Sequence, residues 1–405
     1  MSDIVDFAAV VLIVAGGLFV AVATSKVSAW FPIPGPAIFL IVAAVASDVF
    51  PGLGVLSVET ASHIGVVALI VILFEGGMDV GWRRFRTAWP EITILGVPGT
   101  FGTALLVALF AHLVLDVSWS IAAVVGAALA PTDPAVMFSV LGRKEIRGRS
   151  GTMLLGESGV NDPVGISLMI GALEFATSDD ASFWPAALEF VWQMAVGLAL
   201  GILGAMVLRV AVGRIDLPNA TLYPILALSF AGILYGATTL ARGSGFLAVF
   251  VAGLLFDEVR SPHKRDVERF HKSLAGLAEI AMFTVLGLTI TLSDFGDRGI
   301  WLDGLLLAVL LVFVARPVAV GPLLVPMRLR WGERVFVLWG GLRGAVPIVL
   351  GTLALLEGVD EGERVYDVIF AVVLFSVLVQ GTSIPYVAPR LGVRMRSSSE
   401  DRAEG

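Results

Sequence analysis

Extended apolar runs of about 20 residues recur along the whole chain, and they restrict its fold more than any other feature. A helix of roughly 20 apolar residues is long enough to cross a bilayer. The composition agrees, because 57% of the 405 residues are hydrophobic and only 15% are charged. The chain is therefore predicted to be an all-α integral membrane protein. This excludes a soluble enzyme with one membrane anchor, a nucleic-acid-binding protein and a disordered protein.

Hydropathy and the positions of helix breakers predict about thirteen spans, roughly at 4–23, 35–50, 60–78, 90–114, 119–141, 152–173, 184–211, 219–240, 244–257, 273–292, 299–324, 335–356 and 365–388. No linker divides them, so residues 1–388 are expected to form a single transmembrane domain. Residues 389–405 are expected to be a short polar cytoplasmic tail, disordered from about 391. The chain has no cysteine, which excludes disulfides and cysteine-based metal sites.

The distribution of basic residues predicts how the spans are oriented. If the N-terminus lies outside, all but five of the 27 basic residues fall in cytoplasmic segments, as the positive-inside rule requires. The exceptions on the outer side are Arg242, Arg298 and Arg364, and two more, Arg316 and Arg343, lie within spans. The predicted topology is N-out and C-in.

Two of the predicted spans contain helix-breaking residues. The sequence Ala-Pro-Thr-Asp-Pro occupies 130–134, and Gly-Gly-Leu-Arg-Gly-Ala-Val-Pro occupies 340–347. Proline removes a backbone donor and clashes with the preceding turn, so neither span is expected to be one continuous helix. The two spans run in opposite directions and lie seven spans apart, which predicts an inverted repeat with an ion site near the membrane centre. The alternative is a pair of ordinary proline kinks.

The span at 152–173 carries polar side chains, and Asp162 lies near the bilayer centre. Four residues fall within about 140° of its circumference and form one polar wedge: Glu157, Ser158, Asn161 and Asp162. A charge at this depth costs roughly 2.5–3.5 kcal/mol on insertion scales, so packing alone does not explain it.

Glu157 and Arg343 lie at similar predicted depths, which predicts a buried ion pair between their two spans. Leaving either partner alone would cost on the order of 3–5 kcal/mol. Arg316, which precedes Pro317, is a supporting residue, and the alternative is that its side chain snorkels toward the cytoplasm.

The sequence indicates no obvious cationic partner for Asp133 or Asp162, so a monovalent cation or a proton is expected to compensate them in turn. Hard cations prefer oxygen ligands, and unwound helix ends supply carbonyls. The predicted ligand set is Asp133, Asp162, the hydroxyl of Ser158 and the carbonyl of Thr132.

Once the cation leaves, burial and the neighbouring carboxylate favour the protonated form of Asp162. Cation and proton then compete for one site, and a site that cannot cross the membrane empty and charged makes the protein an obligatory exchanger. Because Asn161 is not a third carboxylate, one proton per monovalent cation is expected, which is electroneutral exchange.

Several of these residues also have structural explanations. Asp133 precedes Pro134 in the order typical of a helix N-cap, and Ser158 can bond back to its own helix. Glu75, near the inner end of span 60–78, is either an interfacial acid or part of the inner vestibule. The four histidines lie near span ends or in a loop and are not expected to form a metal cluster.

Two other functions compete with exchange. Gly156-Glu157-Ser158-Gly159 matches a Gly-x-Ser-Gly nucleophile pattern, but no histidine lies at that depth to act as a base. An aspartyl protease would use Asp133 and Asp162. A cation channel needs no protonatable carboxylate in two matched broken helices. The chain is therefore not expected to be an enzyme, and no cofactor is expected.

The chain resembles the NhaP-type monovalent cation/proton antiporters across nearly its whole length. The matching pieces are Phe-Glu-Gly-Gly at 74–77, Pro-Thr-Asp-Pro at 131–134, Gly-Glu-Ser-Gly-Val-Asn-Asp-Pro at 156–163, Gly-Phe-Leu-Ala at 245–248 and Gly-Leu-Arg-Gly-Ala-Val-Pro-Ile at 341–348. The surroundings of Asn161 and Asp162 are most similar to the potassium/proton branch. The resemblance leaves the choice between Na⁺ and K⁺ open.

This resemblance implies a thirteen-span homodimer in a prokaryotic cell (plasma) membrane. Spans 4–6 and 11–13 would form the ion-carrying core, which slides like an elevator and contains the crossed broken spans 5 and 12. Spans 1–3 and 7–10 would form the dimerisation scaffold. The implied ligands are again Asp162, Asp133, Ser158 and Thr132, with Glu75 contributing. The implied stabilising pair is Glu157 with Arg343.

Overall fold

The computed structural model describes residues 15–16, 19, 34–49, 56–141, 144–146, 148–178, 181–259, 261–393 and 395–397. This part of the chain is helical apart from two three-residue strands. Six of its helical stretches are long and apolar enough to cross a membrane: Val58–Val80, Trp82–Leu115, Phe183–Arg214, Leu222–Leu240, Ile300–Leu324 and Gly362–Arg390. Shorter apolar helices accompany them. The prediction of a helical, multi-pass membrane protein is confirmed, while the predicted span 4–23 lies almost entirely outside the described residues.

The first half of the chain forms α2 (Gly35–Val49), α3 (Val58–Val80), α4 (Trp82–Ile94), the π-helical turn η2 (Leu95–Gly99), α5 (Thr100–Leu115), α6 (Trp119–Leu129), α7 (Pro134–Leu141), β1 (Lys144–Ile146), α8 (Arg149–Thr177) and α9 (Phe183–Arg214). Serine side chains begin some of the helices by accepting a hydrogen bond from a first-turn amide, as Ser57 does for α3 and Ser118 does for α6.

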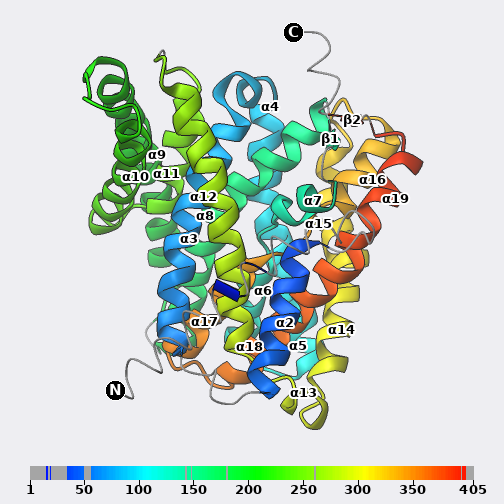
Figure 1. The fold of residues 1–405 in the computed structure, drawn as a ribbon. Helices are drawn as coiled ribbons and strands as arrows, with labels where there is room; N and C mark the ends of the chain where they lie inside the picture. Colours follow the sequence, from blue (N-terminus) through cyan, green and yellow to red (C-terminus); the bar gives the residue numbers. More distant parts are fainter. Residues whose placement is uncertain are drawn as a thin grey trace.

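The second half forms α10 (Leu222–Leu240), α11 (Gly245–Phe256), α12 (Lys264–Leu288), α13 (Asp294–Asp297), α14 (Ile300–Leu310), η3 (Leu311–Ala315), α15 (Arg316–Leu324), α16 (Trp331–Trp339), α17 (Ala345–Leu356), α18 (Gly362–Phe375), η4 (Ser376–Gly381), α19 (Thr382–Arg390) and β2 (Met395–Ser397). In Figure 1, α9, α10 and α11 gather on the left and α14, α15, α16 and α19 on the right, with α3 and α12 between them and α17 below α3.

Both predicted helix interruptions are present. The first separates α6 from α7, and the second separates α16 from α17. The two interruptions touch, because the amide of Asp133 donates a hydrogen bond to the carbonyl of Leu342 over 2.8 Å. Two helices that are broken by proline and glycine therefore place their unwound backbones against each other inside the bundle.

The buried apolar residues form two separate cores. The smaller core joins α3, α9, α10, α11 and the start of α12, and the larger core joins most of the other helices with further residues of α3, α11 and α12. α3 and α11 approach closely at Gly77 and Gly253, where a Cβ atom on either glycine would overlap the backbone of the other helix.

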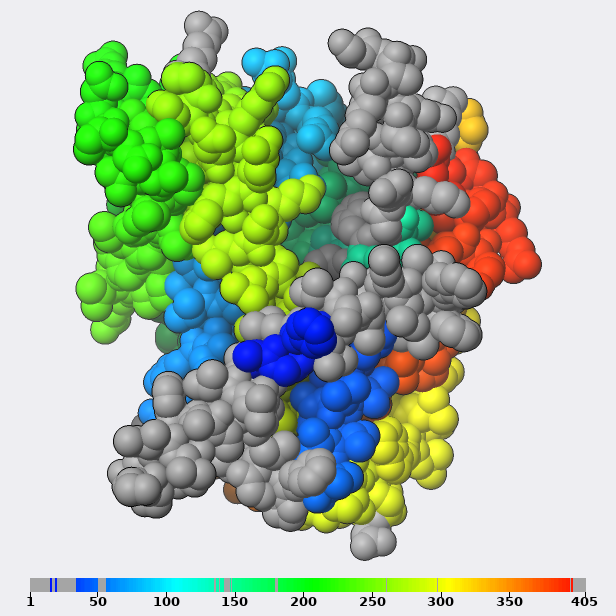
Figure 2. All heavy atoms as spheres, viewed as in Figure 1, coloured from blue at the N-terminus to red at the C-terminus, as the bar shows by residue number. Residues whose placement is uncertain are grey.

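The outer surface of the α9–α10 layer is strongly apolar. This layer stands at the left edge of the molecule in Figure 2. Large side chains that α9 leaves exposed include Leu188, Val191, Trp192, Leu203 and Met206. Such a continuous apolar surface suits contact with lipid or with another protein surface, but not with water.

The expected disorder of the tail from about residue 391 is wrong for residues 395–397. These residues form β2, which pairs antiparallel with β1, and Ile146 lies opposite Met395. A polar segment becomes ordered in this way because its backbone completes hydrogen bonds with another strand, whatever its side chains are. Residues 398–405 lie outside the described part of the chain.

Candidate functional site

Helix α8 carries the predicted polar wedge into the larger core. Its four members are all buried, with exposed fractions of 1% to 5%: Glu157, Ser158, Asn161 and Asp162. Close packing brings them to the interruption between α6 and α7, because Gly165 of α8 lies against the ring of Pro131 and leaves no room for a Cβ atom. The wedge therefore faces unwound backbone and not another complete helix.

Asn161 joins α8 to this unwound segment. Its Nδ2 atom donates a hydrogen bond to the hydroxyl of Thr132 over 2.8 Å, and its Oδ1 atom accepts one from the amide of Thr132 over 3.4 Å. Both residues are buried. The amide side chain thus uses its donor and its acceptor together, which a carboxylate cannot do.

Asp133 and Asp162 are brought together, as predicted. Asp162 is 5% exposed and interacts electrostatically with Asp133, and its Oδ1 atom has no hydrogen-bond partner among the described residues. The carboxylate of Asp133 lies directly against Gly344 at the second interruption, where a Cβ atom would overlap it. Two acids from different elements therefore meet at the point where both broken helices unwind.

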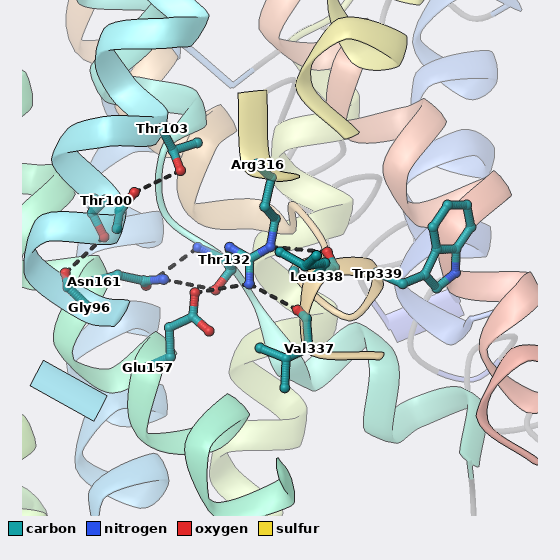
Figure 3. A network of polar contacts seen from close by, with 12 residues as sticks. Gly96, Thr100, Thr103, Thr132, Glu157, Asn161, Arg316, Val337, Leu338 and Trp339 are labelled. Atoms are coloured by element: carbon teal, nitrogen blue, oxygen red, sulfur yellow. Dashed lines mark hydrogen bonds and ion pairs between the residues drawn. The ribbon is translucent and has the colours of Figure 1, made fainter. Parts of the chain in front are cut away.

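The predicted ion pair between Glu157 and Arg343 is wrong, because the structure gives Glu157 a different partner. Arg316, the first residue of α15, donates from Nη2 to Glu157 Oε1 over 2.9 Å. Figure 3 shows the Arg316 side chain between Glu157 and the end of α16, where it also donates to the carbonyls of Val337 and Leu338. Arg316 is 2% exposed, so the snorkelling alternative is also wrong.

Arg343 instead donates hydrogen bonds to backbone carbonyls at the two helix interruptions. Its Nε atom donates to the carbonyl of Leu129 at the end of α6 over 2.9 Å, and its Nη1 atom donates to the carbonyl of Gly341. Among the described residues Arg343 forms no ion pair. The physical reason is that the last carbonyls of a half-helix lack internal partners and carry partial negative charge. Depth alone could not distinguish this role from an ion pair with Glu157.

A further acid was missed in the sequence. Glu279 of α12 interacts electrostatically with Asp133 and Glu75, and its buried Oε1 atom has no hydrogen-bond partner in the described part of the chain. The only signal was an isolated acid within the apolar run 273–292, without a recognisable motif. Glu75 of α3 is partly buried and lies within this group of acids.

The acids are spread out and do not surround one point. Across the described residues, no group of three or more histidine or acidic residues could hold a metal ion together. A cavity of about 780 Å³ lies elsewhere, between α4, α8, α9 and α11, and its lining is almost entirely apolar. Such a cavity does not suit a cation, so the acids remain the candidate site.

Known proteins resemble this chain in sequence. The family described as "Sodium/hydrogen exchanger, transmembrane" matches residues 15–389. The K(+)/H(+) antiporter NhaP of Alkalimonas amylolytica is 34% identical over 96% of this chain and 68% of the relative. The K(+)/H(+) antiporter NhaP2 of Shewanella sp. (strain ANA-3) is 34% identical over 91% and 64%. The Na(+)/H(+) antiporter ApNhaP of Aphanothece halophytica is 27% identical over 80% and 63%.

The fold is also similar to a solved structure. The sodium proton antiporter MjNhaP1 from Methanocaldococcus jannaschii at pH 8 superposes with a TM-score of 0.80 and 22% identity, covering 96% of this chain and 99% of that chain. The chain spans about two thirds of the length of the curated relatives named above. Since the family matches nearly the whole chain at the level of sequence, the protein belongs to the transmembrane sodium/hydrogen exchanger family.

Proposed function

We propose that this chain is a secondary active antiporter that exchanges a monovalent cation for a proton without net charge movement. The observation that carries the proposal is Asp162, which is 5% exposed inside an apolar bundle and whose Oδ1 atom has no hydrogen-bond partner among the described residues. A buried carboxylate in such surroundings requires a positive species, either a cation or a proton. Asp162 and the neighbouring Asp133 therefore form the site at which the two compete.

The remaining ligands follow from what surrounds this pair. Ser158 lies on the same helix as Asp162, one turn away, and Thr132 lies on the unwound segment next to Asp133. The hydroxyl of Ser158 and the carbonyl of Thr132 would complete an oxygen site for the transported cation. Asn161 holds Thr132 by two hydrogen bonds and adds no charge of its own. One proton per cation is the resulting stoichiometry.

The architecture of transport is part of the proposal. Thirteen spans in N-out, C-in topology would form an inverted repeat in which the two touching interruptions belong to crossed helices. The moving part would comprise spans 4–6 and 11–13 and the scaffold spans 1–3 and 7–10, as the resemblance to the NhaP-type antiporters implies. The exposed apolar face of α9 would form part of a homodimer interface in a prokaryotic plasma membrane.

The transported cation is Na⁺ or K⁺, and the relatives favour K⁺. The two relatives at 34% identity are named as K(+)/H(+) antiporters, whereas the Na(+)/H(+) antiporter named above is 27% identical. A channel and an intramembrane protease are not supported, because the family consists of exchangers.

Reconstituted vesicles test the proposal. Proteoliposomes with a preset pH gradient should lose that gradient when K⁺, Na⁺ or Li⁺ is added outside, as followed by dequenching of a pH-sensitive dye. Asp162→Asn should abolish the response while the protein remains folded on size-exclusion chromatography. Exchange at an undiminished rate in Asp162→Asn would contradict the proposal, and cation current without proton movement would indicate a channel.

A further inference from the structure

The apolar cavity between α4, α8, α9 and α11 has no role in the proposed function. Along α9 its lining runs from Phe190 to Arg209, which at 1.5 Å per residue is a length of about 28 Å. Its volume of about 780 Å³ falls within the range of about 300–1,000 Å³ that small-ligand pockets cover. A cavity this long for its volume is narrow, so it suits an extended apolar chain and not a compact ligand.

Charge is confined to one end of this cavity. Arg209 of α9 and Glu258 of α11 are the charged residues of its lining, and their side chains lie 3.6 Å apart with 53% and 44% of their surface exposed. Phe190 and Leu247 lie at the other end of the lining on the same two helices. The cavity is therefore apolar along its length and charged where it ends, which matches the polarity of an amphipathic molecule.

The start of α4 lies at the charged end. Gly81, which precedes α4, lies against Asp257, the residue before Glu258. Trp82 and Phe85 of the first turn line the cavity. Tryptophan is enriched where the hydrocarbon of a membrane meets its headgroups, because the ring has an apolar body and a polar N–H group. The charged end is therefore expected at the surface of the bilayer and the apolar length within it.

Exposed arginines surround this first turn. Arg83 interacts with Asp257, whereas Arg84 and Arg86 are exposed and form no ion pair within the described part of the chain. Arg86 follows Trp82 by four residues, so it lies on the same side of the helix and close to the charged end of the cavity. Unpaired basic residues beside a gap between helices on the cytoplasmic side are typical of sites for anionic lipid headgroups.

The cavity opens sideways toward lipid. Leu198 and Met206 line it and are 48% and 59% exposed. Trp192 and Val207 are also exposed, but they lie about 120° and 180° around α9 from Leu198. Lipid can therefore enter the cavity while the other side of α9 remains available to a second copy of the chain.

We propose that this cavity is a binding site for an anionic phospholipid of the cytoplasmic leaflet. One acyl chain lies in the cavity, and the phosphate lies at the charged end, where Arg209 and Arg86 bind it and Glu258 opposes it. The choice of leaflet rests on the N-out topology of the proposed function, whereas the binding itself does not.

The bound chain contacts the helix that carries the ion site. Val160 and Val164 of α8 line the cavity, and they stand two residues before and two residues after Asp162. At 100° per residue they face about 160° away from Asp162. The lipid therefore forms part of the wall behind the ion site and does not enter it.

Native mass spectrometry of the purified protein in detergent tests the site. Dioleoyl phosphatidylglycerol would be titrated against an equal concentration of dioleoyl phosphatidylcholine, and the wild type should retain about one phosphatidylglycerol per protomer in preference. Arg209→Gln and Arg86→Gln should each weaken this binding by about fivefold, and Glu258→Gln should strengthen it by a similar factor. Arg214→Gln is the matched control and should stay within about twofold, because Arg214 lies about 140° around α9 from Arg209.

Several outcomes would overturn the site. Equal retention of phosphatidylcholine would show that charge does not select the lipid. An equal loss in Arg214→Gln would indicate only the general surface charge. Glycerol 1-phosphate that binds as tightly as phosphatidylglycerol would indicate an anion site without a chain.

Leu198→Trp tests the apolar part without changing any charge. Leu198 is 48% exposed, so the variant is expected to fold even where an arginine variant does not. The larger ring should fill the cavity and weaken retention of phosphatidylglycerol. Unchanged retention would overturn the site, and a change from dimer to monomer with unchanged retention would show that a second copy covers the cavity. Lipid retention is measured without transport, so a failure of exchange in proteoliposomes would overturn the proposed function and leave this result standing.

Discussion

Two buried carboxylates on α8, five residues apart, differ in whether a cationic side chain lies beside them. Glu157 is 1% exposed and is held at 2.9 Å by Arg316, whose guanidinium also ties α8 to the end of α16. Asp162 is 5% exposed, and each acid leaves one oxygen without a hydrogen-bond partner among the described residues, but Glu157 has an arginine beside it while no ion pair of Asp162 occurs there. Burial is the same, so burial alone does not identify the functional acid. The difference is that one charge has a permanent partner and the other is left for a partner that comes and goes.

The comparison of Glu157 with Asp162 is tested most strongly by removing Arg316, the permanent partner of Glu157. Arg316→Met leaves Glu157 buried and alone, so the free energy of unfolding should fall by about 3–5 kcal/mol. Thermal unfolding of the purified protein would measure this change. A double-mutant cycle should give strong coupling between Glu157→Gln and Arg316→Met and weak coupling between Glu157→Gln and Arg343→Met. Stronger coupling with Arg343 would contradict the pairing seen in the structure.

Asn161→Asp sharpens the comparison by adding a third carboxylate between the two. The variant loses the hydrogen bond from Nδ2 to Thr132 and buries a charge, which should destabilise the protein by about 2–3 kcal/mol. The new acid should also make exchange depend on membrane potential, measured in proteoliposomes with an imposed K⁺ diffusion potential and Na⁺ as the transported ion. Asn161→Ala is the control, because it loses the hydrogen bond without gaining charge. Potential-independent exchange in Asn161→Asp would count against the assigned stoichiometry.

Asp162→Asn should not destabilise the protein, unlike loss of the ion pair between Glu157 and Arg316. Removing a carboxylate that lacks a permanent partner should leave stability unchanged or raise it by about 1 kcal/mol. The same melting experiment would show this, in buffer free of Na⁺ and K⁺. A large loss of stability would mean that Asp162 has a structural partner and that the contrast between the two acids does not hold.

A pair just beyond the last residue of α11 gives the smallest effect. Burial alone would raise the pKa of Asp257, but the hydrogen bond and charge of Lys264 at 2.9 Å, together with those of Arg83, outweigh it and lower the pKa below its usual value. A lowered folded-state pKa contributes stability above the pKa of the unfolded chain, and this is lost as pH falls through the folded value. Asp257→Asn should remove about 0.5 kcal/mol at pH 7 and less at low pH. A loss that does not change with pH would argue against the ion pair.

Features that local chemistry determines were predictable from the sequence. Proline and glycine at 130–134 and 340–347 break a helix wherever it lies, and a wedge of polar side chains on one helix is visible from its periodicity. The partner of Glu157 was not predictable, because depth in the membrane fixes only one coordinate of Arg343 and Arg316. Which arginine reaches Glu157 also depends on the rotation of each helix about its axis and on the unpaired carbonyls at the broken helix ends. Glu279 carries no motif, and the pairing of β1 with β2 depends on backbone hydrogen bonds that leave no side-chain pattern.

The central claim is that a cation and a proton exclude each other at Asp162. Proton release on cation binding tests it most directly, using purified protein in weakly buffered solution to which KCl or NaCl is added, with choline chloride as the control for ionic strength. The account predicts that the wild type releases about one proton per bound cation, and that Asp162→Asn releases none. Glu268→Gln should behave like the wild type, because Glu268 of α12 pairs with Lys264 at 3.5 Å. Undiminished release from Asp162→Asn would contradict the account.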